Sequence, residues 1–473
     1  MILETPLSQT ASSPVLGPLS NARLVAFASS GIPLAMMGLM VGTYMPRFFA
    51  GHIGISLIAV GGAFTLVRLI DIAFDPFIGT IMDRTNTPLG RYRIWMLASV
   101  PILMLSLAML FMPPPHADEG YLVLWLLVYY AGNSILVLAH AAWAASLATS
   151  YHERSRIYGW MQGIGVLGSV SLLLLPLLTQ GRITAGRGES MQAIGWIIVA
   201  LVPITVAIVA VFAPERMNLE TKRENVPLRA YWDMMARPTM RRIIIADLFL
   251  ALGPGTTGPI FIFFFHDAKH FNVAQISFLL IPYIGAGLLG APVWAALARR
   301  FGKHRTLMAA TVCYAITQTI LMAIPAGLWI PTAIGMFAVG FCASSFLLLI
   351  RAMVADVADE VRLEQGKERM GLMYAMVTST QKIGAAISVT IIFAVLQMVG
   401  YQAAESAVNT PSAIFGLEMC YLFAPILLVL VGGACFFGYN LDEAAHSVIR
   451  DALAERDAAE LAARGANAVP GVA

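Results

Sequence analysis

Long apolar stretches alternate with short polar ones over nearly the whole chain. A helix needs about 20 apolar residues to cross the hydrocarbon core of a bilayer, and twelve stretches reach this length. We place the spans near residues 24–46, 56–82, 94–113, 121–149, 157–179, 191–213, 243–265, 274–298, 306–325, 329–356, 371–398 and 414–438. The pattern therefore predicts an all-α membrane protein with twelve transmembrane helices.

The polar segments between these stretches divide the chain into two similar parts. A charged segment, residues 214–240, separates the sixth and seventh spans, and short basic loops follow the second span (79–93) and the eighth (290–305) at matching places. Two six-helix bundles with such a repeat are typical of the major facilitator fold, whose bundles move about a site near the bilayer midplane. We expect a tail at 1–22, a bundle at 23–213, a linker at 214–240, a bundle at 241–438 and a tail at 439–473.

Composition supports the membrane assignment and excludes several function classes. The 473 residues are 58% hydrophobic and only 12% charged, whereas a soluble domain carries about 25% charged residues, so we set nucleic-acid binding aside. The four cysteines lie in apolar stretches without a CxxC pair, so neither a disulfide framework nor a metal site is indicated. The chain has no GxxxxGK[ST] loop and no nucleophile motif. We therefore expect no enzyme, no direct use of ATP and no tightly bound cofactor.

The basic residues predict how the chain lies in the membrane. Of the 30 lysines and arginines, 23 fall on the side that holds both termini, four on the other side and three inside spans. Cytoplasmic loops carry an excess of Lys and Arg, so both termini should be cytoplasmic. Residues 1–22 lack the apolar core of a signal peptide. We expect a monomeric, multi-pass protein in the lipid bilayer of a bacterial inner membrane.

The second span carries three charged residues on one helical face, namely Arg68, Asp71 and Asp75 at positions i, i+3 and i+7. Each charge at membrane depth costs at least about 2.5 kcal/mol unless it is paired or faces a wet cavity. Two neighbouring carboxylates can hold one cation or share one proton, and Arg68 can neutralise part of their charge when the site is empty. We predict a cation-coupling site here; a static Arg68–Asp71 pair that fixes helix packing is the alternative.

Two further spans hold candidate substrate-binding residues. Lys382 follows Gln381 in the eleventh span, and its ammonium needs a partner such as Asp71 or Asp75. It either senses cation occupancy and binds substrate or forms a structural ion pair. In the fourth span His140 and Trp143 lie three positions apart; the Trp143 ring could stack on a sugar or an apolar tail, while a lone histidine is more often hydrogen-bonded structure.

Two other features suggest how such a protein would move. The segment 253–259, rich in glycine and proline, is expected to interrupt the seventh span as a hinge or a packing kink. Charges of both signs also lie at the predicted cytoplasmic ends of both bundles, where ion pairs between bundles could close the inner side. This cytoplasmic gate set is Asp83, Arg84, Arg91, Arg93, Arg154, Asp356, Asp359 and Arg369.

Two sequence blocks resemble a known family. The first is Asp71-Ile-Ala-Phe-Asp75-Pro-Phe-Ile-Gly, followed by Asp83-Arg84 and Gly90-Arg91-Tyr-Arg93; the second runs from Arg351 to Ala386 and contains Lys382. Both resemble the glycoside–pentoside–hexuronide:cation symporters, the melibiose-carrier family within the major facilitator superfamily. The resemblance implies a secondary active transporter, with symport of a small organic solute coupled to H⁺ or Na⁺. Related lipid carriers share the carboxylates of the second span.

The chain also departs from this resemblance. Positions where the family's sugar carriers hold carboxylates correspond to Ala35 and Ala139, and polar positions near the cation site correspond to Phe74 and Leu136, while Trp143 is kept. Asn133 and Ser134 could add oxygens for Na⁺, but Phe74 makes the site poor in oxygen and favours H⁺. A sugar- or glycoside-like solute, an amphipathic or lysolipid-like solute, and a non-transporting membrane scaffold or assembly factor stay open as hypotheses.

Overall fold

The computed structural model describes residues 19–85, 87–147, 151–178, 188–215, 228–366, 369–404 and 407–467. We call the helices before residue 216 the N-half and those after residue 227 the C-half. The N-half contains α1 (Asn21–Ala28), α2 (Gly31–Leu39), η1 (Met40–Tyr44), α3 (Met45–Arg47), η2 (Phe48–Ile53), α4 (Leu57–Arg84), α5 (Tyr92–Phe111), α6 (Glu119–Leu147), α7 (Tyr151–Leu178) and α8 (Gly188–Phe212). The C-half contains α9 (Leu228–Ala236), α10 (Pro238–Phe263), η3 (Phe264–Ala268), α11 (Val273–Phe301), α12 (Lys303–Ala323), α13 (Trp329–Gln365), α14 (Met370–Met398), α15 (Pro411–Ala434) and α16 (Glu443–Asn467).

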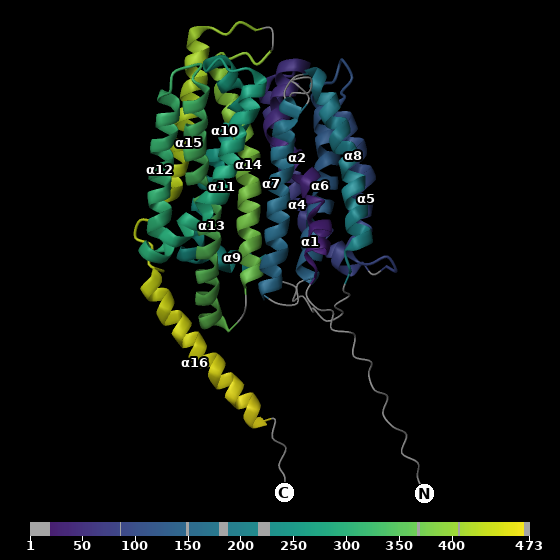
Figure 1. The fold of residues 1–473 in the computed structure, drawn as a ribbon. Coiled ribbons are helices and arrows are strands. Elements are labelled where there is room, and N and C mark those ends of the chain that lie inside the picture. The colour runs from purple at the N-terminus through teal and green to yellow at the C-terminus, as the bar shows by residue number, and fades with distance from the viewer. Residues whose placement is uncertain are drawn as a thin grey trace, which may run out of the picture.

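Twelve segments of the described chain are long and apolar enough to cross a membrane, which confirms the predicted number of spans. The N-half and the C-half stand side by side with their helices roughly parallel (Figure 1). The first span is longer than predicted, because α1 to η2 form one segment, Asn21–Ile53. It ends at Gly54, whose φ of 88° is the left-handed conformation that stops a helix.

The polar segments differ in detail from the sequence-based expectation. Part of the predicted linker, residues 214–240, is helical, because it contains α9 and the start of α10; residues 216–227 lie outside the described chain. Helix α13 continues nine residues beyond its predicted end at 356, through charged residues that favour helix, and stops at Gly366 with φ 67°. The long helix α16 follows the last span and leaves the bundle at the end where α13 stops (Figure 1).

The expected interruption at residues 253–259 is wrong, since α10 is continuous from Pro238 to Phe263. Within this stretch the hydroxyls of Thr256 and Thr257 donate to the carbonyl oxygens of Gly253 and Pro254 at 2.7 and 2.8 Å, a local bond that threonines often make inside a helix. Gly253 also packs tightly, because a Cβ there would lie 2.5 Å from Val429 Cγ2. The glycines therefore serve close helix packing rather than a break.

The N-half and the C-half contact each other mainly through α4 and α14. Thr65 donates to the carbonyl of Ala386 at 2.6 Å, and Thr390 donates to the carbonyl of Gly61 at 2.8 Å. Farther along, the Tyr44 hydroxyl donates to Ser277 at 3.1 Å. All these contacts lie toward the membrane side opposite the basic loops, so the two halves are closed on that side.

Gly61 offers a direct test of this closed side. A Cβ at Gly61 would lie 3.1 Å from Thr390 Cα, whereas at Gly62 nothing lies within 4 Å. We expect Gly61→Leu to separate α4 from α14 and to lengthen the distance between spin labels placed at His116 and Val408, one in each half. Gly62→Leu is the matched control and should leave the distance distribution unchanged. Equal distributions in the two variants would contradict the assigned contact.

Candidate functional site

The charged residues predicted from the second and eleventh spans meet at the interface between the halves. The ammonium of Lys382 on α14 lies 3.2 Å from Asp71 Oδ2 and is also ion-paired with Asp75 Oδ2, both on α4. On its other side Asp71 Oδ1 accepts a hydrogen bond from Ser134 Oγ of α6 at 2.6 Å. One cationic group of the C-half therefore bridges both carboxylates of the N-half.

Arg68 completes the cluster on α4. Its NH1 lies 3.9 Å from Asp71 Oδ2, and its guanidinium stands 4.3 Å over the ring of Tyr130. Asp71 is only 4% exposed, and Asp75 Oδ1 is buried with no hydrogen-bond partner among the described residues. The carboxylates of Asp71 and Asp75 thus face the cationic side chains of Arg68 and Lys382, and Asp75 Oδ1 is positioned to accept a proton or a cation.

A cleft of about 450 Å³ lies next to this cluster. Its wall is formed by Arg68 of α4 together with residues of α10, α11, α13 and α14, including Tyr283, Phe346 and Lys382. A smaller cavity of about 150 Å³ lies inside the N-half, lined by Arg68, Tyr130 and Asn133. Small-molecule sites have volumes of about 300–1,000 Å³, so the larger cleft has room for a solute beside the charged cluster.

Sequence reasoning missed one acidic residue of this cleft. Asp247 of α10 is 2% exposed, lines the cleft, and accepts a hydrogen bond from Gln381 Nε2 at 3.1 Å. The signal was present, because an acid inside a membrane span marks a functional site by default.

The two candidate residues of the fourth span lie elsewhere. His140 Nε2 is 3.0 Å from the carbonyl oxygen of Phe27 and 3.2 Å from Ser30 Oγ, inside the N-half. Trp143 is fully buried, and its Nε1 donates to the carbonyl of Pro214 at 3.2 Å. Neither ring reaches the cleft in this conformation, so a contact of either residue with solute stays a prediction.

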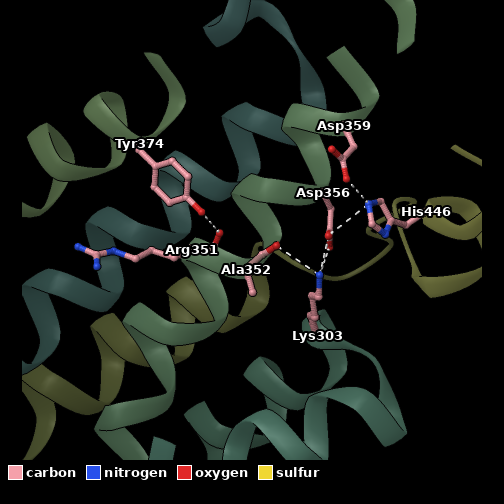
Figure 2. Close-up of polar contacts among 7 residues, drawn as sticks. All are labelled: Lys303, Arg351, Ala352, Asp356, Asp359, Tyr374 and His446. Atoms are coloured by element: carbon pink, nitrogen blue, oxygen red, sulfur yellow. Dashed lines mark hydrogen bonds and ion pairs between the residues drawn. The ribbon is translucent and has the colours of Figure 1, made fainter. Parts of the chain in front are cut away.

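Two acidic residues of the predicted cytoplasmic gate, Asp356 and Asp359, have partners within the C-half (Figure 2). Lys303 Nζ of α12 lies 2.5 Å from Asp356 Oδ1 and also donates to the carbonyl of Ala352. His446 of α16 is 3.0 Å from Asp359 Oδ2 and 3.5 Å from Asp356 Oδ1. Helix α16 thereby contacts the end of α13 through Asp356 and Asp359, the two aspartates that the sequence predicted to pair with the N-half.

The described basic residues of the gate set form no ion pair with these aspartates, whose ion-pair partners are Lys303 and His446. Arg93 donates from NH2 to the carbonyl of Ala213 at 3.0 Å, within the N-half. Arg84 is exposed, Arg91 precedes α5, and Arg369 precedes α14 without a side-chain hydrogen bond to the start of that helix. The side chains of Asp83 and Arg154 lie outside the described residues. Among the described residues of this set no ion pair joins the two halves, so the latch stays a prediction for a conformation closed on this side.

The same geometry shows on which side the two halves are in contact. The halves are joined by Tyr44, Thr65 and Thr390 on one side, and no described gate residue joins them on the other. In Figure 2 the guanidinium of Arg351 points away from the aspartates at the end of α13, while its backbone carbonyl accepts from the Tyr374 hydroxyl at 3.1 Å. The described contacts therefore close the cleft on the side opposite the basic loops.

Comparison with known proteins places the chain among transporters. It is 27% identical to the isoprimeverose transporter of Lactiplantibacillus pentosus over 426 residues, which cover 87% of each protein. It is 21% identical to the sodium-dependent lysophosphatidylcholine symporter 1-A of Danio rerio, over 89% of this chain and 85% of that protein. The crystal structure of the nucleoside transporter NupG shares the fold with a TM-score of 0.66 at 13% identity, covering 88% of this chain and 99% of NupG.

The family assignment rests on a match that spans nearly the whole chain. Residues 26–443 match the sequence profile of a family described as MFS/sugar transport protein. This agrees with the resemblance carried by the blocks around Asp71 and Lys382, and it agrees with the prediction that the chain is not an enzyme. The chain is a multi-pass membrane transporter, and it belongs to the family of MFS/sugar transport proteins.

Proposed function

We propose that this protein is a cation-coupled symporter of the inner membrane that moves a sugar-like solute by alternating access, with the coupling ion at Asp71 and Asp75. One observation carries the proposal: Lys382 of the C-half contacts both aspartates of the N-half beside a cleft large enough for a solute. Both walls of the cleft belong to one chain. We therefore propose that a monomer contains the complete transport pathway.

Lys382 supplies the physical basis for coupling. In the present conformation its ammonium occupies the position where a free cation would bind, and it ties α14 to α4. A proton or cation that binds at the aspartates weakens these ion pairs, and the Lys382 ammonium and α14 can then move away from α4. If the solute binds better to the rearranged cleft, the ion and the solute each raise the affinity for the other by the same factor.

The oxygens around the pair favour a proton as the coupling ion. Hard metal cations are bound by several oxygens at once. The oxygens described at the aspartates are their own four and the Ser134 hydroxyl, while Asn133 lines the smaller cavity instead. A proton needs only one oxygen, and Asp75 Oδ1 is without a hydrogen-bond partner among the described residues. We therefore propose H⁺; Na⁺ is the alternative, since the relative from Danio rerio is named sodium-dependent.

A lysolipid-like solute is the second candidate. The relative named as a lysophosphatidylcholine symporter supports it, and so do the exposed apolar rings of Phe74 and Phe77 on α4, 46 and 61% exposed. A polar solute would gain little from these rings, whereas an acyl chain would be stabilised by them. A transport assay must therefore include both kinds of solute.

Uptake into proteoliposomes tests the proposed function. We expect labelled isoprimeverose to accumulate when an inward H⁺ gradient is imposed, and accumulation to stop when a protonophore collapses the gradient. An Na⁺ gradient alone and no gradient are the ionic controls, and liposomes without protein give the background. Accumulation of lysophosphatidylcholine but not of the sugar would select the second candidate. Uptake of neither solute above background would overturn the proposal.

A further inference from the structure

The coupling mechanism leaves one buried acid of the cleft without a role. Asp247 Oδ1 accepts from Gln381 Nε2 at 3.1 Å, but Asp247 Oδ2 is buried and has no hydrogen-bond partner among the described residues. Both residues line the cleft of about 450 Å³. Leaving a buried acceptor unpaired is costly, so the position is suited to a donor that enters the cleft with a ligand.

Two adjacent residues of α14, Gln381 and Lys382, contact different halves of the protein. Successive residues of an α-helix point about 100° apart, so Lys382 faces the aspartates of the N-half while Gln381 faces Asp247 of the C-half. The carboxylates of Asp71 and Asp75 are engaged by Lys382. Asp247 is therefore the carboxylate of the cleft that no described cationic side chain pairs with directly.

The charges around Asp247 limit the chemistry of its ligand. Arg68 and Lys382 line the same cleft and would repel a cationic solute. The carboxylate of Asp247 would repel an anionic group placed against it. A neutral solute that donates hydrogen bonds satisfies both conditions, and neighbouring hydroxyls on a sugar ring are donors of this kind.

We propose that Asp247, held in place by Gln381, forms the solute-binding subsite of the C-half, where its carboxylate accepts hydrogen bonds from hydroxyls of a neutral glycoside and disfavours glycosides that carry a carboxylate. This inference rests on the proposed transport of a sugar-like solute and adds the residue that selects its charge. Gln381 is a positioning residue in this account, because its amide fixes one carboxylate oxygen and leaves the other for the solute.

Two probes that differ in a single group test the proposal. 4-Nitrophenyl β-glucoside and 4-nitrophenyl β-glucuronide share ring and aglycone, but the glucuronide carries a carboxylate in place of the hydroxymethyl group. Equilibrium binding to the purified full chain should favour the glucoside. Because hydrogen bonds to charged groups are strong, Asp247→Asn should weaken glucoside binding by about tenfold or more. It should also tighten glucuronide binding, since the repulsion is removed.

Control variants separate this effect from misfolding and from failure of the wider account. Glu418→Gln, an acid of α15 that is not part of the cleft lining, should bind both probes like the unmodified chain, and thermal unfolding reports the stability of every variant. Gln381→Leu should weaken glucoside binding less than Asp247→Asn. If the unmodified chain binds the glucoside and Asp247→Asn binds it equally well, the subsite is wrong and the proposed function stands. If the unmodified chain binds neither probe, the proposed function fails.

Discussion

Replacing Asp75 by asparagine is expected to abolish accumulation of solute against its gradient while the chain stays folded. Asparagine has nearly the shape of aspartate, but it neither binds a proton near neutral pH nor attracts a cation. Lys382 keeps Asp71 as a partner at 3.2 Å, so the ion pair between α4 and α14 is weakened but not lost. The ion gradient then no longer drives transport, although the cleft still binds solute.

Two assays on the same proteoliposomes separate coupling from binding. Accumulation under an imposed ion gradient should fall to the level without a gradient in Asp75→Asn, whereas exchange of labelled for unlabelled solute should continue. Asp451→Asn, an exposed acid on α16, is the matched control and should accumulate solute normally. Full accumulation by Asp75→Asn would show that the ion does not act at this carboxylate.

Replacing Lys382 by methionine is expected to reduce both stability and coupling. The change leaves the buried Asp71 next to the half-buried Asp75, with Arg68 3.9 Å from Asp71. Removing one partner of a buried ion pair costs about 3–5 kcal/mol, and since Lys382 is 24% exposed we expect the lower end of that range.

Thermal unfolding of purified variants measures this effect. Lys382→Met should unfold at a temperature well below that of the unmodified chain. The double variant Asp75→Asn/Lys382→Met should recover much of the lost stability, and the two changes should be strongly non-additive, as expected for residues in contact. Additive losses would mean that Lys382 and Asp75 do not stabilise each other.

Much of the fold and the centre of the site follow from local sequence rules. Apolar length predicts the twelve spans, and helical periodicity places Arg68, Asp71 and Asp75 on one face. The cost of a charge in the membrane predicts a partner for Lys382, and the structure supplies that partner in both aspartates. These inferences succeed because each depends on a single helix or on a rule that holds for any membrane span.

The remaining features depend on contacts between segments distant in sequence. No local pattern shows that His446 of α16 contacts Asp359 of α13, or that Gln381 of α14 contacts Asp247 of α10. A rule that treats Gly and Pro as helix breakers likewise does not predict that α10 continues through Pro254 and Pro259. One sequence also encodes both states of a transporter, so it does not indicate which side is closed here.

The central claim is that a cation binds at Asp71 and Asp75 each time solute crosses the membrane. Solute-evoked ion flux tests it most directly: solute is added outside proteoliposomes without any imposed gradient, and the internal pH is followed with a trapped dye, with a parallel sample carrying radioactive sodium. The account predicts that solute entry brings protons inward with the unmodified chain and brings none with Asp75→Asn. Solute entry without movement of either ion, or an unchanged ion flux in Asp75→Asn, would contradict it.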